Sequence, residues 1–232
     1  MYNFPTISSG VICLSRTSDS VTAIFRDVEM PHPQIVADNA PSLTAVLFGL
    51  SGCLVDFGSM AHADSVPASE TLATPGALKI LQWLNDQGTP CAWLDELPPA
   101  VTTPLAAALP QWLQGTRPAT TPWPAPHACW QALMDLNIER LDGCVLVSGE
   151  PRLLQAGLNA GLWTIGLASC GSLCGLSPSQ WQALSEQARE HKRAKATVAL
   201  YGLGVHSVID HLGDLGTCLA DISLRRLKGE KP

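Results

Sequence analysis

The stretch FGLSGCLVDFGS, residues 48–59, directly continues the apolar run TAVLFGL, residues 44–50. A short apolar run that ends in a glycine-containing turn is typical of a fully buried strand. Further along the chain, similar apolar runs alternate with segments whose apolar residues recur at helical spacing. This alternation predicts a parallel sheet covered by helices.

The pattern predicts a doubly wound, mainly parallel α/β sheet with helices on both faces. The expected strands are residues 44–50, 90–94, 143–149, 162–168 and 206–210. The expected helices are residues 75–88, 104–113, 127–138, 152–161, 177–200 and 212–229, and Ser177 is a candidate N-cap of the long one. Ligands of such sheets normally bind beyond the carboxyl ends of the strands.

Residues 1–41 have a different character from the rest of the chain. Two β-rich runs, GVICLSR (10–16) and VTAIFRDV (21–28), flank the turn-like TSDS and indicate an antiparallel hairpin. We therefore predict a β-rich N-terminal extension over residues 1–41 and a core domain over residues 42–232. The extension is expected to cover the sheet, to extend it or to pair between subunits.

The composition excludes some classes of protein. A net charge of -6 without a cluster of Lys and Arg argues against nucleic-acid binding. No apolar run is long enough for a transmembrane helix, and the first residues do not resemble a secretory signal, so we expect a cytoplasmic protein away from membranes. Only 15% of the residues are charged, which favours burial of a neutral surface against a partner or a second copy.

The 8 cysteines are scattered and indicate packing residues rather than a disulfide framework. Cys170 and Cys174 are close together but lack neighbouring histidines, so they do not match the ligand pattern of a zinc site.

FGLSGCLVDFGS resembles the opening motif of the haloacid dehalogenase superfamily, and most closely that of the phosphonoacetaldehyde hydrolase branch. GLNAGLWTIGL (157–167), GLSPSQW (175–181), HSVIDHLGDL (206–215) and RRLKGEKP (225–232) follow the order and spacing of that branch. The resemblance covers about residues 43–232. It implies the fold predicted above and, in the family, an aspartate nucleophile that attacks beside Mg²⁺.

The residues that match the family's catalytic positions lack the required chemistry. Gly49 stands where the nucleophile is expected, Ser51 at the small second position, and Gly52 at the turn. Cys53 stands where Thr is usual. Trp93 and Leu94 stand where the family has a phosphate-binding Ser or Thr, and Trp123 stands where it has a basic residue. The family's metal-binding motif is matched by Ser148, Gly149 and Leu153.

The cap domain that the resemblance implies also has no counterpart of the expected length. Residues 59–74 fit a loop, and no lysine precedes Lys79 for the family's Schiff-base step. No lysine lies between Lys79 and Lys192, so Arg117 is the only substitute cation that we consider for this centre.

An alternative is an enzyme of altered chemistry, with weak phosphatase or phosphonatase-type activity and Mg²⁺ held by carboxylates near strand ends. Its candidates are Asp56, Asp95, Glu96 and Glu150. The structural interpretation is that Asp56 organises its loop, that Asp95 and Glu96 are solvated, and that Glu150 points elsewhere. His62 and His127 are expected near the pocket and His206 matches the family's HYVID-like segment, but no Ser or Cys partner indicates a nucleophile and base pair.

The sequence thus favours a non-catalytic, cap-less, phosphonatase-like protein without a cofactor that acts as a binding, regulatory or assembly module. Its former active-site face would contact a protein partner, a second copy or a small neutral ligand. Trp93 and Trp123 either line that face, as tryptophans do at binding hot spots, or fill the vacated pocket.

Overall fold

The computed structural model describes residues 42–63, 72–116 and 120–232. All of them belong to one unit of the chain, Ala37–Pro232. The hairpin predicted within residues 1–41, and Arg117, lie outside the described residues. No helix of the described part is both long and apolar enough to cross a membrane.

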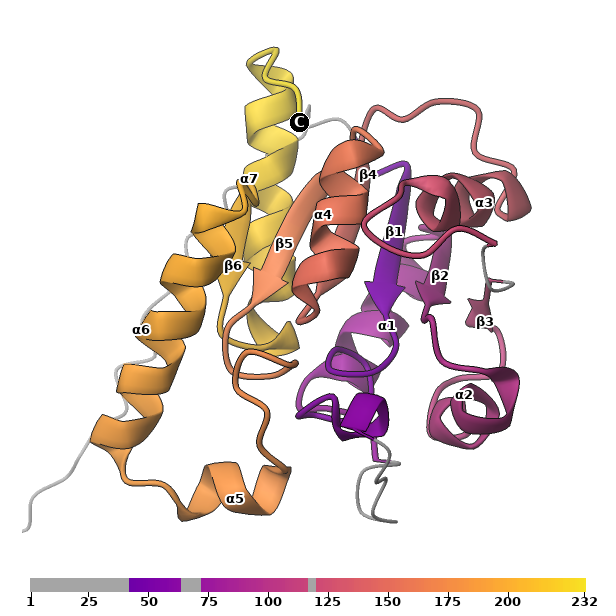
Figure 1. The fold of residues 1–232 in the computed structure, drawn as a ribbon. Coiled ribbons are helices and arrows are strands. Elements are labelled where there is room, and N and C mark those ends of the chain that lie inside the picture. The colour runs from indigo at the N-terminus through magenta and orange to yellow at the C-terminus, as the bar shows by residue number, and fades with distance from the viewer. Residues whose placement is uncertain (1–41, 64–71, 117–119) are drawn as a thin grey trace, which may run out of the picture. The chain divides into compact units, whose positions relative to one another are not determined.

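A parallel sheet of six strands in the order β3-β2-β1-β4-β5-β6 forms the centre of the described unit (Figure 1). The strands are β1 Ala45–Gly49, β2 Cys91–Leu94, β3 Gln114–Gly115, β4 Cys144–Ser148, β5 Trp163–Leu167 and β6 Ser207–Ile209. Every residue of β1, β4 and β5 is buried, as is usual for parallel strands covered on both faces. The fold class predicted from the sequence is confirmed.

Alternate residues of the central strand face two separate cores. Val46 and Phe48 of β1 pack on the side of α1 (Ala77–Asp86) and α7 (Leu215–Leu227). Ala45 and Leu47 pack on the opposite side, against α3 (His127–Asp135) and α4 (Pro151–Asn159). Figure 1 shows these two helix layers on either side of the sheet.

Three further helices complete the described unit. α2 spans Pro99–Ala106, α5 spans Pro178–Ala183 and α6 spans Glu186–Gly202. Two short 3₁₀ helices, η1 (Met60–Ala63) and η3 (Leu212–Asp214), lie in connections. η1, η3 and the two-residue strand β3 are too short for the sequence pattern to indicate.

Two predicted helix boundaries are wrong. The helix predicted over residues 104–113 instead begins at Pro99, because proline fits the first position of a helix, and it ends before Pro110. The single helix predicted over residues 177–200 is two helices, since Leu184 is extended (φ -71°, ψ 147°). Ser185 then starts α6 by accepting a hydrogen bond from the Ala188 N–H at 3.2 Å. The N-cap predicted at Ser177 is present in α5.

Candidate functional site

β1 ends at Gly49, and the loop that follows it is organised by the buried carboxylate of Asp56. This carboxylate accepts hydrogen bonds from the N–H groups of Met60 (2.8 Å) and Ala61 (2.9 Å) at the start of η1, and from the Ser51 hydroxyl. The backbone of Asp56 is in the left-handed region, with φ of 50°. The structure thus gives Asp56 the loop-organising contacts that the structural interpretation expected.

Ser51 joins Asp56 to Asp95, which follows β2. The Ser51 N–H donates to Asp95 at 3.0 Å, and Asp95 also accepts from the Leu97 N–H at 2.9 Å. Asp95 is therefore not the freely solvated residue that the structural interpretation expected. Its carboxylate connects the loops after β1 and β2.

At the carboxyl end of β1, the Ser148 side chain crowds the position where an aspartate side chain would begin. A Cβ added at Gly49 would lie 2.7 Å from the Ser148 Oγ and 3.3 Å from Leu153. Ser148 is fully buried, and its hydroxyl accepts the Glu150 N–H at 3.0 Å. At this point the Ser148 side chain of β4 occupies the volume next to position 49, where the family resemblance implies a nucleophile.

The loops after β1, β4 and β5 meet through backbone atoms at Gly52, Gly149 and Gly171. A Cβ at Gly149 would overlap the Gly52 carbonyl oxygen and lie 2.8 Å from the Gly171 Cα. A Cβ at Gly52 would also lie 2.8 Å from the Gly171 Cα. We call this contact of Gly52, Gly149 and Gly171 the glycine contact. Gly171 lies outside the motif positions predicted from the sequence.

The residues at this centre do not fit Mg²⁺. Mg²⁺ in proteins is held by one or two carboxylates together with waters and substrate phosphate. Positions 49 and 149 carry no carboxylate; Ser148 crowds the first position and the glycine contact crowds the second. Within residues 42–63, 72–116 and 120–232, no three His, Cys, Asp or Glu side chains are grouped to hold a metal ion.

A second polar group lies around Arg152 at the start of α4. Its guanidinium pairs with Glu96 at 3.1 Å and donates to the Trp123 carbonyl oxygen. Glu96 also accepts the Trp123 N–H, so Glu96 is not simply solvated as expected. Glu150 caps α4 by accepting the Arg152 N–H at 3.2 Å.

Arg152 corrects the expectation that only Arg117 would supply a cation at this centre. Its guanidinium contacts Trp123, the residue at the family's basic position, although it comes from a different element. A comparison of matched positions misses such a residue. In the structure Arg152 pairs with Glu96, and its side chain is 56% exposed.

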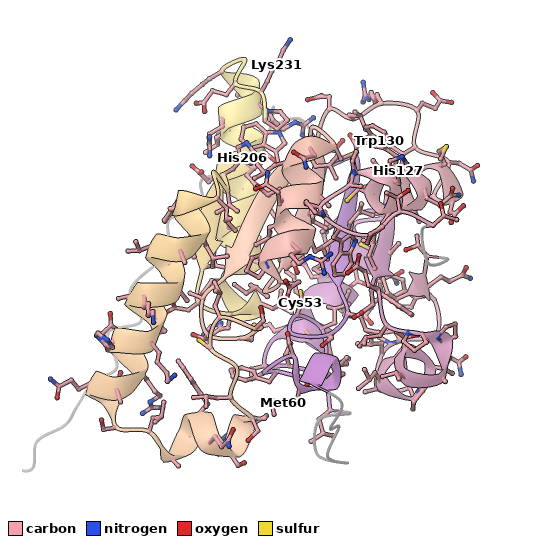
Figure 2. The ribbon with its side chains drawn as sticks, viewed as in Figure 1. Cys53, Met60, His127, Trp130, His206 and Lys231 are labelled. Carbon is pink, nitrogen blue, oxygen red and sulfur yellow. The ribbon has the colours of Figure 1, made fainter. Side chains whose placement is uncertain are left out.

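Cys53 is not an activated nucleophile. Its thiol is buried and contacts the Val147 carbonyl oxygen at 3.5 Å. Burial raises its pKa well above the ordinary value for a thiol, and the nearby Cys170 raises it further. The thiolate required for attack is therefore disfavoured. Figure 2 places Cys53 in the loop after β1.

His127 and His206 form no catalytic pair with Cys53. Figure 2 shows His127 beside Trp130, well separated from Cys53, and their rings are 6.0 Å apart. His206 precedes β6, at the amino end of the strand, and its Nδ1 accepts the Thr164 N–H at 3.0 Å. His62 lies in η1, and its side chain is outside the described part.

Two open cavities lie beyond β2, and Asp95 lines both. One of about 330 Å³ is lined by Asp95, Glu96, Thr120, Thr121, Pro122, Trp123 and Ala128. The other, of about 240 Å³, is lined by Trp93, Asp95, Leu97, Pro99, Thr102, Thr103, Gly115 and Thr116. Trp123 is 4% exposed and packs into the core, whereas Trp93 is half-buried against Gly115. The lining of these cavities thus combines apolar side chains with the carboxylates of Asp95 and Glu96, and Glu96 is paired with Arg152.

Comparison with known proteins agrees with this fold. No family model matches the chain. A solved structure 64% identical in sequence superposes with a TM-score of 0.80, covering 82% of this chain and 100% of the other. A phosphonoacetaldehyde hydrolase like protein from Oleispira antarctica is 20% identical, with a TM-score of 0.74 and coverages of 83% and 97%. A HAD family hydrolase from Deinococcus radiodurans is 20% identical, with a TM-score of 0.51 and coverages of 80% and 98%.

The described unit therefore shares its fold with these solved structures, one of which is a HAD family hydrolase. In sequence, the chain is phosphonoacetaldehyde hydrolase-like. It is 32% identical over 170 residues to the phosphonoacetaldehyde hydrolase of Klebsiella pneumoniae, which covers 72% of this chain. The chain spans 63% of the length of that hydrolase.

Proposed function

We propose that this chain is a non-catalytic relative of the phosphonoacetaldehyde hydrolases that acts as a binding, regulatory or assembly module. The observation that carries the proposal is the glycine contact at the carboxyl ends of β1, β4 and β5. In a functioning site of this superfamily, this is where the resemblance implies a nucleophile and metal ligands. Here backbone atoms and the Ser148 side chain occupy the same space.

The carboxylates nearest to this centre are already engaged by the protein. Asp56 and Asp95 accept hydrogen bonds from loop donors, and Glu96 pairs with Arg152. A carboxylate that accepts several backbone N–H bonds stabilises a loop, and removing it for catalysis would leave those donors unpaired. These contacts favour a structural role for the acidic residues over the alternative metal site.

The binding face of this proposal is the pair of cavities beyond β2. Threonine hydroxyls, Asp95 and Glu96 give it hydrogen-bonding groups, and Trp93 gives it an aromatic wall. Strand ends of doubly wound sheets are the usual place for ligands, which supports a retained binding role after loss of chemistry. The partner proposed is another protein or a second copy of the chain.

A turnover assay tests the loss of catalysis. The purified chain is incubated with phosphonoacetaldehyde or p-nitrophenyl phosphate in the presence of Mg²⁺. We expect no release of phosphate above that of a heat-denatured sample. Mg²⁺-dependent release that is lost in the Asp95→Asn variant would instead support the alternative of altered hydrolase chemistry.

A capture experiment tests the binding face. Thr120→Arg places a large cation at the exposed rim of the first cavity, and Thr217→Arg places the same group on the exposed surface of α7 as a matched control. We expect a protein captured by the tagged chain to be lost with Thr120→Arg and retained with Thr217→Arg. Equal capture by both variants would contradict the assignment of this face.

A further inference from the structure

The outward face of α1 carries an ordered row of exposed side chains. They recur at spacings of three and four residues, which places them on one side of the helix, and we call them the α1 surface: Lys79, Gln82, Trp83 and Asp86. The opposite side of α1 is buried in the core. In Figure 1, α1 covers the face of the sheet opposite α3 and α4. The α1 surface is therefore separate from the cavities beyond β2 and does not depend on the function proposed for them.

Trp83 gives this surface an apolar centre. It is 43% exposed and borders an open groove of about 200 Å³ between α1 and the segment that forms η3 and the start of α7. The groove is lined by Gly76, Lys79, Ile80, Trp83, Leu212, Gly213 and Gly216. A Cβ added at Gly216 would meet nothing within 4 Å, so this wall is open to close approach. An exposed tryptophan beside an apolar groove is typical of a protein interface.

The two charges of the α1 surface are available to a partner. Lys79 makes no ion pair in the part of the chain that the structure describes. Asp86 accepts a hydrogen bond from the Gln82 side-chain amide at 2.7 Å, which leaves its negative charge unneutralised. About 10 Å along the helix axis, or two turns, separates Lys79 from Asp86. The surface thus has a cation at one end, a carboxylate at the other and a tryptophan between them.

Such a row is complementary to its own reverse. When two α1 helices pack antiparallel across a two-fold axis near Gln82 and Trp83, Lys79 of each copy lies opposite Asp86 of the other. The two Trp83 side chains then meet beside the axis. A parallel arrangement would instead bring Lys79 against Lys79 and Asp86 against Asp86, and like charges repel. The charge pattern therefore fits a second copy of the chain in one orientation.

We propose that this chain forms a two-fold symmetric dimer through the α1 surface, with the two α1 helices antiparallel. Trp83 forms the centre of the contact, and the pairs between Lys79 and Asp86 lie at its rim, as charged residues commonly do at interfaces. A contact made mainly by one helix of 10 residues is small beside the roughly 800 Å² per partner of a stable interface. The dimer is consequently weak, with Kd on the order of 100 μM.

Charge reversal on α1 tests the proposal. Sedimentation equilibrium of the whole chain in low-salt buffer, where surface charges are least screened, measures the dimer Kd. Lys79→Glu and Asp86→Lys each replace two attractive pairs with two repulsive ones, so each should weaken the dimer about 10-fold. Both variants are expected to stay folded, because an acidic residue near the start of a helix and a basic one at its end are favourable.

An equimolar mixture of the two variants gives the sharpest result. In a mixed dimer Glu at position 79 faces Lys at position 86, and Asp86 faces Lys79, so both pairs are attractive again. We expect the mixture to associate as tightly as the parent chain, although neither variant does so alone. The double variant, with both changes in one chain, should dimerise like the parent for the same reason.

Lys195→Glu is the matched control, because it makes the same charge reversal at an exposed position of α6. It should leave the dimer Kd unchanged. A parent chain that stays monomeric up to about 1 mM, ten times the Kd expected for so small a contact, would overturn the proposal. So would association that Lys79→Glu and Asp86→Lys leave intact, since the contact would then lie on another surface.

Discussion

A side chain at position 49 is crowded in this fold, because its first carbon would lie 2.7 Å from the Ser148 Oγ and this hydroxyl would have to shift. Glycine at this position is therefore accompanied by a neighbouring side chain that occupies the adjoining volume. Gly149 shows the same relation to the backbone of Gly52 and Gly171. Substitutions that restore single catalytic residues are consequently expected to lower the stability of the protein without creating a working site.

Gly149→Ala is predicted to destabilise the protein by about 1–3 kcal/mol, since the added methyl group is forced into well-packed backbone. Its control is Gly202→Ala in α6, where an added Cβ meets nothing within 4 Å. That change should be neutral or stabilise by up to about 1 kcal/mol. Urea unfolding measures both. Equal stability of Gly149→Ala and the parent would mean that the glycine contact is loose.

The same residues show which parts of the site the sequence indicates. Gly49, Ser148 and Gly149 are recognised by position in a motif, which requires only local order along the chain. The glycine contact joins residues 52, 149 and 171, which are far apart in the sequence, and a glycine alone does not reveal what its backbone touches. Arg152 was missed for a similar reason, because it reaches the family's basic position from another element.

Among the elements, the strands and the central helices are predicted well because buried strands and amphipathic helices have strong periodicity. The division of residues 177–200 into α5 and α6 was missed, since both halves have helix-forming composition. The break depends on the extended Leu184 and on a second cap at Ser185.

Ser185→Ala is predicted to cost about 1 kcal/mol of stability through loss of the N-cap of α6. Ser172→Ala, at an exposed loop position, is the control and should change the stability by less than about 0.5 kcal/mol. Chemical denaturation compares the two variants. Equal effects of the two changes would argue that α5 and α6 behave as one continuous helix.

For the folded unit as a whole, His206 joins the amino end of the sheet to α7. Its ring lies 4.8 Å from that of Trp163, its Nδ1 accepts the Thr164 N–H, and its carbonyl oxygen accepts from Arg225 at 3.2 Å. Burial lowers the pKa of His206 below its ordinary value, and the Arg225 guanidinium lowers it further. A protonated Nδ1 could no longer accept the Thr164 N–H.

Because the folded state favours neutral His206, its contribution to stability is complete above the unfolded pKa of about 6.5 and is lost as the pH falls below that value. His206→Asn should flatten this part of the pH dependence, and the exposed His127→Gln should leave it in place. Unfolding free energies measured between about pH 5 and 8 test the prediction. A parent-like pH dependence in His206→Asn would assign it to other groups.

The central claim is that the former catalytic centre is closed to a metal ion, and titration with Mn²⁺, which has the ligand preferences of Mg²⁺, tests it most directly. The readout is paramagnetic broadening of backbone amide signals in an NMR spectrum of the isotopically labelled chain. If the centre is closed to a metal ion, the amide signals of Gly49, Gly52 and Gly149 should broaden no more than those of exposed glycines such as Gly88 and Gly161. Selective broadening of Gly49, Gly52 and Gly149 at submillimolar Mn²⁺ would show a metal bound there and would contradict the claim.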